Sequence, residues 1–520
     1  MHRRDLLRLL SVSPLAAAAA QAGLWPVGPV FAQGAQPDVE LELTASPGSA
    51  ALRPGAATDL WRYTGRVLRG PASALQEIPG SYLGPVVRVK RGQRVRIHFR
   101  NRLPEPSIVH WHGLDVPERA DGHPRLAVDP NADYVYDFEV VNRAGTNWYH
   151  PHPHMRTAWQ AYHGLAGLVL VSDPEEDALR LPSGEAELLF VLQDRRFDAN
   201  NQLVYAGGGA PMGGGRGMGR GMGMGRGGMQ QMMETMNGWL GDQMLVSGRV
   251  QPTLDVDRRT YRVRLLNGSN ARMYKLALST GAPFTVIGGD GGLHPQPHTM
   301  RFLTLAPGQR ADVLVDLSAQ AGGSTVELQS VAFPAADAGR VGMMGETSPA
   351  PQGAPVTLAR LRVSNRQGPR YEAPARLSAD GFTADAAAPV RRVPLTFMQM
   401  NWFIDGRTFE MLETTAAETV NAGSTHIWEF VNQPNPMGMQ MAHPIHMHGR
   451  QFRVLSRTGG SANALREGIH DRGWTDTVLV LPGETVRVQV TFSTFPGLYL
   501  YHCHILEHED MGMMRNFRIR

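Results

Sequence analysis

Four His-x-His pairs constrain the fold of this 520-residue chain more than any other feature. Successive side chains of a strand point to opposite faces, so residues two apart share a face. A pair on a strand therefore directs two imidazoles into one space. The fold must bring four such strands together around eight imidazoles, which, divided as two, three and three, suit three metal ions with open positions for a small molecule. The pairs are His110-Trp111-His112, His150-Pro151-His152, His446-Met447-His448 and His502-Cys503-His504.

The only cysteine of the chain indicates a second kind of metal site. Cys503 lies between His502 and His504, so on a strand it points to the opposite face. His443 also points away from its neighbouring pair, because it precedes that pair by an odd number of residues. Two imidazoles, one thiolate and a weak axial thioether are the ligands of a blue-copper site. The predicted ligands are His443, Cys503, His508 and Met513.

The motifs around these residues resemble those of the multicopper oxidases: HWHG, WYHPH, HPIHMHG and YHCHILEHEDMGM. The resemblance covers nearly the whole chain after its N-terminal segment. It implies an all-β fold of three cupredoxin-like Greek-key β-sandwich domains, four copper ions per chain, and one-electron oxidation of a substrate coupled to reduction of dioxygen to two waters. The implied ligands are His110 and His446 for type 2 copper, His112, His150 and His504 for one type 3 copper, His152, His448 and His502 for the other, and His443, Cys503, His508 and Met513 for type 1.

The reduction of dioxygen consumes protons, so carboxylates are needed near the cluster. By motif match, Asp121 and Glu509 fill the acidic positions of the family. The remaining histidines lack a paired pattern. We interpret His98, His163, His294, His298, His426 and His470 as ordinary polar or core residues, and we do not expect His123 or His154 to be ligands.

Short alternating runs rich in β-branched residues, separated by Gly, Pro and Asn, are typical of β-sandwiches. A strand that ends near an asparagine recurs at 95–101, 261–267 and 427–432, but histidine pairs follow only the first and third copies. We therefore expect the cluster where the first and third domains meet, with the second domain as a spacer and substrate wall. The predicted divisions are a signal segment at 1–32, domains at 38–175, 183–365 and 376–520, and linkers near 174–184 and 364–376.

The N-terminal segment resembles an export signal. Arg3 and Arg4 precede an alanine-rich apolar stretch, and Val30-Phe31-Ala32 offers a cleavage site. The paired arginines favour the twin-arginine export machinery as a partner and a periplasmic or otherwise exported location, with an uncleaved anchor as the alternative. We expect a monomer without a permanent membrane anchor. The formal net charge of +4 is small for this length and does not indicate a surface that binds nucleic acid.

A glycine-arginine segment at 207–237 carries eight methionines between Met212 and Met236. Such a composition cannot bury a core, so we predict a surface loop, with a short helix near 230–236. Thioethers are soft ligands that select Cu(I), and low-complexity drift is the alternative. A second group precedes His443, where core packing is equally plausible, and Met398 and Met400 could join either group. The candidate substrate methionines are Met218, Met222, Met224, Met229, Met232, Met233, Met236, Met437, Met439 and Met441.

The chain is most similar to the cuprous oxidase branch of copper tolerance, with two departures. That branch carries its methionines in the third domain and has an acidic residue where this chain has Met439. The segment therefore covers the type 1 copper from another side, or only feeds it. We expect a multicopper oxidase that oxidises Cu(I) and, like a laccase, phenols. The alternatives are a general laccase with incidental methionines and a non-enzymatic copper-binding or scaffold protein.

Overall fold

The computed structural model describes residues 36–205, 226–340, 348–379, 381–434, 440–461 and 463–520, without side chains for 226–231 and 340. All elements below belong to the compact unit Asp38–Arg520. The predicted signal at 1–32 lies outside the described residues. Among the described helices, none is both long and apolar enough to cross a membrane.

The first part of the chain forms two sheets that enclose one core. One sheet has the order β2 (Thr58–Arg69), β1 (Val39–Ala50), β5 (Arg94–Asn101), β7 (Asp133–Glu139). The other has the order β3 (Leu75–Gln76), β4 (Val86–Lys90), β9 (Gly167–Ser172), β8 (Gly145–Pro151), β6 (Val109–His110). Every second residue of β5 is buried, which puts Val95, Ile97 and Phe99 into the core between the sheets.

The middle part repeats this arrangement with a seven-stranded and a five-stranded sheet. The first has the order β12 (Arg249–Val250), β11 (Gln243–Val246), β10 (Glu187–Arg195), β14 (Thr260–Asn267), β19 (Arg310–Asp316), β16 (Phe284–Gly289), β17 (Gly292–Met300). The second has the order β13 (Thr253–Arg258), β22 (Val356–Gln367), β20 (Thr325–Ser330), β15 (Tyr274–Leu278), β18 (Leu303–Leu305). Their inner faces share a separate apolar core.

The last part forms the third pair of sheets. One has the order β24 (Asn401–Ile404), β23 (Val390–Met398), β26 (Thr425–Asn432), β31 (Glu484–Thr491), β29 (Phe452–Gly459). The other has the order β25 (Thr419–Val420), β33 (Met514–Ile519), β32 (Gly497–Cys503), β28 (His443–Met447), β30 (Thr477–Val480). A two-stranded ribbon pairs β21 (Gly339–Arg340) with β27 (Gln440–Met441). The apolar core of this part includes Cys503 and Met513.

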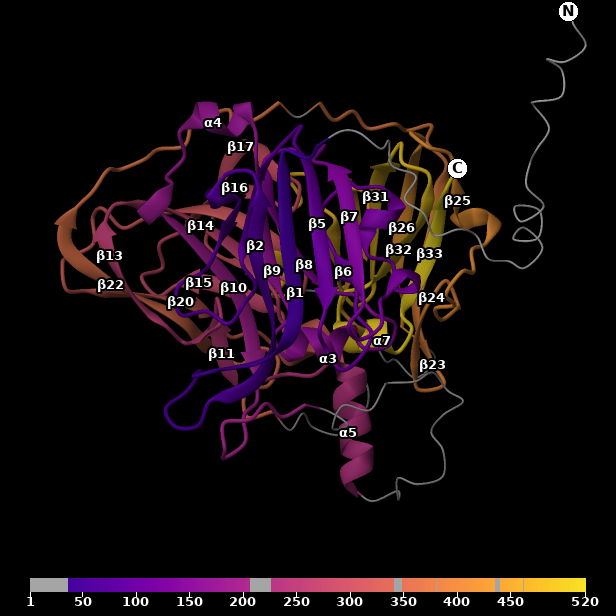
Figure 1. The fold of residues 1–520 in the computed structure, drawn as a ribbon, viewed down its shortest axis with the longest axis horizontal. Coiled ribbons are helices and arrows are strands. Elements are labelled where there is room, and N and C mark those ends of the chain that lie inside the picture. Colours follow the sequence, from indigo (N-terminus) through magenta and orange to yellow (C-terminus); the bar gives the residue numbers. More distant parts are fainter. Residues whose placement is uncertain (1–35, 206–225, 341–347, 380, 435–439, 462) are drawn as a thin grey trace, which may run out of the picture. The chain divides into compact units, whose positions relative to one another are not determined.

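The predicted all-β fold is confirmed, whereas the exact domain boundaries stay a prediction. Strand β22 continues to Gln367, beyond the predicted end of the second domain at 365, and the predicted linker near 174–184 contains the helix α4 (Pro174–Leu179). Three other helices lie close together beside the site. Helix α3 (Thr157–Tyr162) packs on α7 (Leu506–Asp510), and α5 (Arg226–Asn237) contacts α7 below them (Figure 1).

Candidate metal centre

The four histidine pairs come together, with the first histidine of each pair on a strand and the second just past the end of that strand. His110 on β6 pairs with His150 on β8, and His446 on β28 pairs with His502 on β32. The first two strands belong to the first part of the chain and the other two to the last part. All eight imidazoles are buried. We call them the eight-imidazole cluster.

Ring nitrogens of the eight-imidazole cluster converge in sets of three. Within each set, one nitrogen per residue lies within 4.8 Å of the others. The shortest approaches join Nε2 atoms, at 3.1 Å between His448 and His502 and 3.3 Å between His110 and His446. The sets are His110, His112 and His446; His112, His150 and His504; and His152, His448 and His502.

The opposite edges of these rings are held by acceptors. His110 Nδ1 donates to the carbonyl of Asp121 at 2.6 Å and His446 Nδ1 to that of Asp476 at 2.9 Å. A carbonyl only accepts, so each Nδ1 carries the proton and each Nε2 presents a lone pair. Burial first of all, and then the neighbouring imidazoles, lower the pKa of His110 well below its ordinary value, which keeps the ring neutral. Facing lone pairs repel one another unless a cation lies between them, so this donor set fits transition-metal ions.

His112 presents its other nitrogen to the cluster. Its Nε2 lies 3.0 Å from Asp476 Oδ1, whereas its Nδ1 has no partner among the described residues. Within the same described part of the chain, His150 Nε2 and both nitrogens of His504 are also unpartnered. These buried atoms belong to one of the converging sets, which again fits a metal ion.

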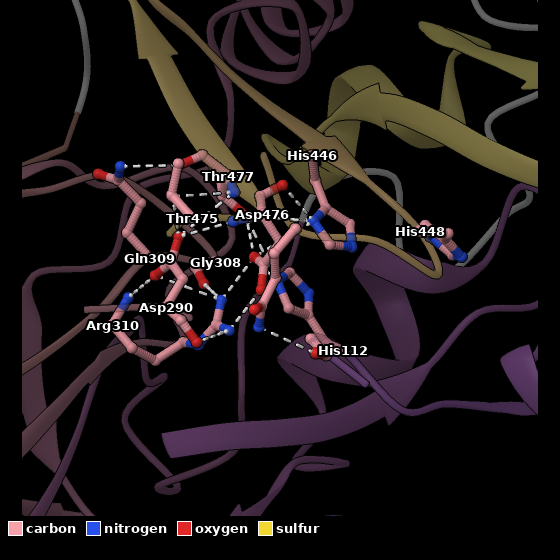
Figure 2. Close-up of polar contacts among 12 residues, drawn as sticks. His112, Asp290, Gly308, Gln309, Arg310, His446, His448, Thr475, Asp476 and Thr477 are labelled. Carbon is pink, nitrogen blue, oxygen red and sulfur yellow. Dashed lines mark hydrogen bonds and ion pairs between the residues drawn. The ribbon is translucent and has the colours of Figure 1, made fainter. Parts of the chain in front are cut away.

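A network of ion pairs and hydrogen bonds lies beside His112 and joins residues from three parts of the chain. Figure 2 shows Arg310 and Asp290 on one side of Asp476, and His112 and His446 on the other. Arg310 Nη1 donates to Asp476 Oδ1 at 2.7 Å, and the main-chain nitrogen of Arg310 donates to Asp290 Oδ1 at 2.7 Å. Burial alone would raise the pKa of Asp476, but the charge and hydrogen bonds of Arg310 outweigh it and hold that pKa below its ordinary value. Sequence analysis missed this network, because no local spacing marks contacts between β19 and the segment before β30.

The two predicted acidic residues are buried beside the cluster. Asp121 Oδ2 accepts a hydrogen bond from His448 Nδ1 at 2.8 Å. The Glu509 carboxylate lies 3.3 Å from His502 Nδ1 and 3.4 Å from His152 Nε2. Asp121 ends the short helix α2 (Glu118–Asp121), and the next residue, Gly122, has φ +89°; a Cβ there would lie 2.3 Å from the carbonyl oxygen of Val109. Only glycine lets this turn lie so close to β6.

The second site, which we call the single-cysteine centre, also forms as the strand alternation requires. Cys503 Sγ lies 3.5 Å from His443 Nδ1 and 3.6 Å from His508 Nδ1, and all three side chains are buried. Met513 is buried in the same apolar core, and its carbonyl accepts from the Cys503 main-chain nitrogen at 3.0 Å. Burial raises the pKa of the Cys503 thiol, so thiolate formation here requires a bound cation.

Helix α5 closes one side of the single-cysteine centre. The carbonyl of Met236 accepts from His508 Nε2 at 2.9 Å and from Trp402 Nε1 at 3.1 Å. Because a carbonyl only accepts, His508 Nε2 carries the proton of the ring. The lone pair of His508 Nδ1 then faces Cys503. The ring centroid of Trp402 lies 4.6 Å from that of His443 and 4.9 Å from that of His508.

The predicted loop at 207–237 is therefore corrected at its end. Residues Arg226–Asn237 form a helix that is longer than expected, and Met233 and Met236 are buried in the core of the third sandwich. Composition alone did not indicate this, because the apolar partners of these two side chains come from a distant part of the chain. Met232 is partly buried there, and Met441 is buried on β27. Met218, Met222, Met224, Met437 and Met439 lie outside the described residues, as does the side chain of Met229.

Most of the other histidines have ordinary partners. His98 pairs with Glu40, His123 with Asn516, His163 with the carbonyl of Trp159, and His426 with Ser424, while the ring of His154 packs near that of Phe409. The other three in the described part of the chain, His294, His298 and His470, lie near one another.

Three segments of the chain, 62–176, 221–324 and 384–520, match multicopper oxidase domains. The chain is 30% identical to the multicopper oxidase mco of Staphylococcus haemolyticus over 440 residues, which cover 85% of this chain and 83% of that protein. It is 29% identical to a laccase of Bacillus subtilis, with 86% of this chain and 90% of the laccase covered. Among solved structures, it resembles the McoA multicopper oxidase of Aquifex aeolicus, with a TM-score of 0.75, 34% identity, and 93% of this chain and 97% of that chain covered.

Proposed function

The chain belongs to the multicopper oxidase family, and from this premise we propose that it oxidises Cu(I), one electron at a time, and reduces dioxygen to two waters. Four Cu(I) ions and four protons are consumed for each dioxygen. Phenols are a second substrate class. The role in the cell is copper tolerance.

Four copper ions per chain would be held by the residues described above. His110 and His446 would hold one ion of the eight-imidazole cluster, and the other six imidazoles would hold two more, as the motifs imply. The single-cysteine centre would hold the fourth. Bound copper would supply one-electron redox chemistry and a binding place for dioxygen.

Groups of the protein itself link the two centres, deliver protons and orient a ligand. Cys503 lies between His502 and His504 in the sequence, at the end of β32, so the main chain links the single-cysteine centre to the cluster. Asp121 and Glu509 are the carboxylates next to the imidazoles, and we assign to them the delivery of protons. Asp476, held by Arg310, orients His112 so that its Nδ1 stays unprotonated and faces the cluster.

The cover over His508 is the observation that favours Cu(I). His508 is fully buried, and the carbonyl of Met236 occupies its Nε2 edge. A bulky phenol therefore cannot touch this ligand without displacing α5. A Cu(I) ion needs no such contact, because the thioethers of the methionine-rich segment are suitable soft ligands for it.

A general laccase is the second candidate, since one of the similar proteins is named a laccase. A non-enzymatic scaffold is a poorer account, because all ten imidazoles and the cysteine thiol are buried and converge. Export by the twin-arginine machinery is inferred from Arg3 and Arg4 alone.

Oxygen uptake tests the choice of substrate. Copper-loaded protein would be supplied with either Cu(I) or 2,6-dimethoxyphenol over a range of concentrations. We expect kcat/KM for Cu(I) to exceed that for the phenol by at least about tenfold, which corresponds to about 1.4 kcal/mol in transition-state free energy. Faster turnover of the phenol would move the laccase to first place. Cys503→Ser protein is the control and should oxidise neither substrate.

A further inference from the structure

Two side chains of the third sandwich donate to one carbonyl oxygen in the last turn of α5. Carbonyls in the last turn of a helix find no donor within the helix itself. His508 Nε2 donates to the Met236 carbonyl at 2.9 Å, and Trp402 Nε1 donates to it at 3.1 Å. A carbonyl oxygen has two lone pairs, so both bonds can form at once. Together they fasten the end of α5 to the third sandwich.

Trp402 is a rigidly held donor for its bond to α5. It lies on β24 opposite Phe397 of β23, and the two rings pack at a centroid distance of 4.7 Å. Its main-chain nitrogen donates to Asn401 Oδ1 at 2.9 Å, and its side chain is 1% exposed. Trp402 is not one of the proposed copper ligands, so its hydrogen bond can be removed without taking a ligand from the single-cysteine centre.

The chain that follows α5 is anchored at residues of the middle sandwich. Arg196 Nε donates to the carbonyl of Leu240 at 2.6 Å, and the Arg196 guanidinium lies 4.0 Å from the ring centroid of Trp239. Between this anchor and α5 lies Gly238, whose φ of +82° is in the left-handed region. Hinges are a few residues at the ends of elements that absorb changes in backbone angles, and Gly238 suits that role. A glycine therefore joins α5 to its anchor.

We propose that Trp402 is a specificity-determining residue that acts by positioning α5. Its Nε1–H stabilises the closed position of α5 over His508, and a turn of α5 about Gly238 opens that position. A bulky phenol reaches His508 only in the open position, so its apparent affinity is reduced by the fraction of protein that is open. This proposal rests on the proposed cover over His508, and it goes further by naming the side chain that sets how often the cover opens.

The size of the effect follows from the loss of one hydrogen bond. Without the Trp402 bond, the ratio of open to closed protein should rise by about two- to tenfold, the factor that corresponds to a net hydrogen bond of about 0.5–1.4 kcal/mol. The Met236 carbonyl keeps its bond from His508, so no buried acceptor is left without a donor. The side chains of Met233 and Met236 stay buried in the third sandwich, so the closed position remains the major one.

Trp402→Phe tests the proposal, with Trp428→Phe as the matched control. Both tryptophans are buried in the core of the third sandwich, but Trp428 Nε1 has no hydrogen-bond partner among the described residues. The two variants therefore lose the same atoms, and only Trp402→Phe loses a bond to α5. Hydrogen exchange of the copper-loaded proteins reports local opening. Exchange of the protected amides of α5 should be about two- to tenfold faster in Trp402→Phe and unchanged in Trp428→Phe.

Kinetics with 2,6-dimethoxyphenol give the second measurement. KM should fall by the same factor in Trp402→Phe while kcat stays constant, because only the fraction of binding-competent protein changes. A residue that merely supports the fold would not change KM and the exchange of α5 by one common factor. Trp428→Phe should keep the KM of wild type.

Four results would overturn the proposal. They are unchanged exchange of α5 in Trp402→Phe, equal acceleration in Trp428→Phe, faster exchange with an unchanged KM, and loss of the blue colour in Trp402→Phe. The last would show that the Trp402 ring supports the copper centre instead. Wild-type oxygen uptake that favours the phenol over Cu(I) would refute the proposed substrate, but neither measurement on the variants depends on that choice.

Discussion

The main-chain carbonyl of Met236 accepts a hydrogen bond from His508 Nε2 at 2.9 Å. The end of the methionine-rich segment is thereby fixed to an imidazole of the single-cysteine centre. Trp402 donates to the same carbonyl and packs against both imidazoles of that centre. The contact joins α5 to the single-cysteine centre. Capture of Cu(I) and exclusion of phenols, the two roles that we propose for the segment, can be tested separately by deletion.

Two nested deletions distinguish capture of Cu(I) by the methionines from shielding of the single-cysteine centre by α5. Removal of 212–225 takes away four methionines but keeps α5, so Cu(I) oxidation at limiting copper should fall while phenol oxidation stays constant. Removal of 212–236, with a short Gly-Ser linker, also takes away the Met236 carbonyl, so oxidation of bulky phenols should rise. Steady-state oxygen uptake measures both rates. An unchanged Cu(I) rate in both deletions would favour low-complexity drift, and an equal rise of phenol oxidation in both would show that α5 is not the cover.

Loss of the Arg310 guanidinium should destabilise the protein strongly. Arg310→Met leaves the buried carboxylates of Asp290 and Asp476 without their main counter-charge, which typically costs about 3–5 kcal/mol of unfolding free energy. Arg362→Met is the matched control, because Arg362 pairs with Asp255 on the exposed surface, where such pairs contribute about 0–1 kcal/mol. Chemical denaturation of the two variants compares these values, and similar losses in both would contradict a stabilising role of the buried network.

Glu509→Gln should slow dioxygen reduction without affecting electron entry. The amide keeps the size of the carboxylate but cannot deliver a proton, and general acid catalysis typically contributes about 10²–10⁴-fold. We expect oxygen uptake to fall by about that factor, while anaerobic bleaching of the blue colour by substrate keeps its rate. Glu507→Gln is the control, because this buried neighbour bonds to Tyr205 and Asn270 instead of the imidazoles. Unchanged oxygen uptake in Glu509→Gln would remove Glu509 from the proton supply.

The imidazoles of His298 and His470 should make the stability of the fold depend on pH. In the unfolded chain a histidine has a pKa of about 6.5, whereas burial lowers the pKa of His298 and His470 to about 4 in the fold. The unfolded chain therefore binds more protons between these values, so the contribution of the two residues is full above about pH 6.5 and is lost as the pH falls toward 4. The thermal midpoint of wild type should fall more steeply over this range than that of a His298→Gln, His470→Gln double variant. If the thermal midpoints of the two proteins fell in parallel with pH, the lowered pKa values of His298 and His470 would be contradicted.

The sequence was sufficient to predict the fold class and which residues meet, because strand alternation is local. Spacing of two placed His502 and His504 on one face and Cys503 on the other, as the structure has them. Contacts between distant segments left no local mark. The packing of Met233 and Met236 depends on Trp402 from another sandwich, and no periodicity connects Arg310 with Asp476.

The chemistry of the ring nitrogens was also beyond the sequence. Which nitrogen of His112 faces the cluster depends on Asp476, and the tautomer of His508 depends on the carbonyl of Met236. Both acceptors come from parts of the chain that a motif does not include. The same holds for His470, whose ring lies near that of His294 only because two sandwiches pack together.

Copper content and colour of wild type and Cys503→Ser test the two-centre account most directly. Wild type should carry four copper ions per chain and be intensely blue, because in this account the Cys503 thiolate would be a copper ligand. Cys503→Ser should carry about three, lose the colour and stop turning over, since the eight-imidazole cluster does not need the thiolate. One copper or none in correctly loaded wild type, or a Cys503→Ser protein that stays blue with four, would contradict the account.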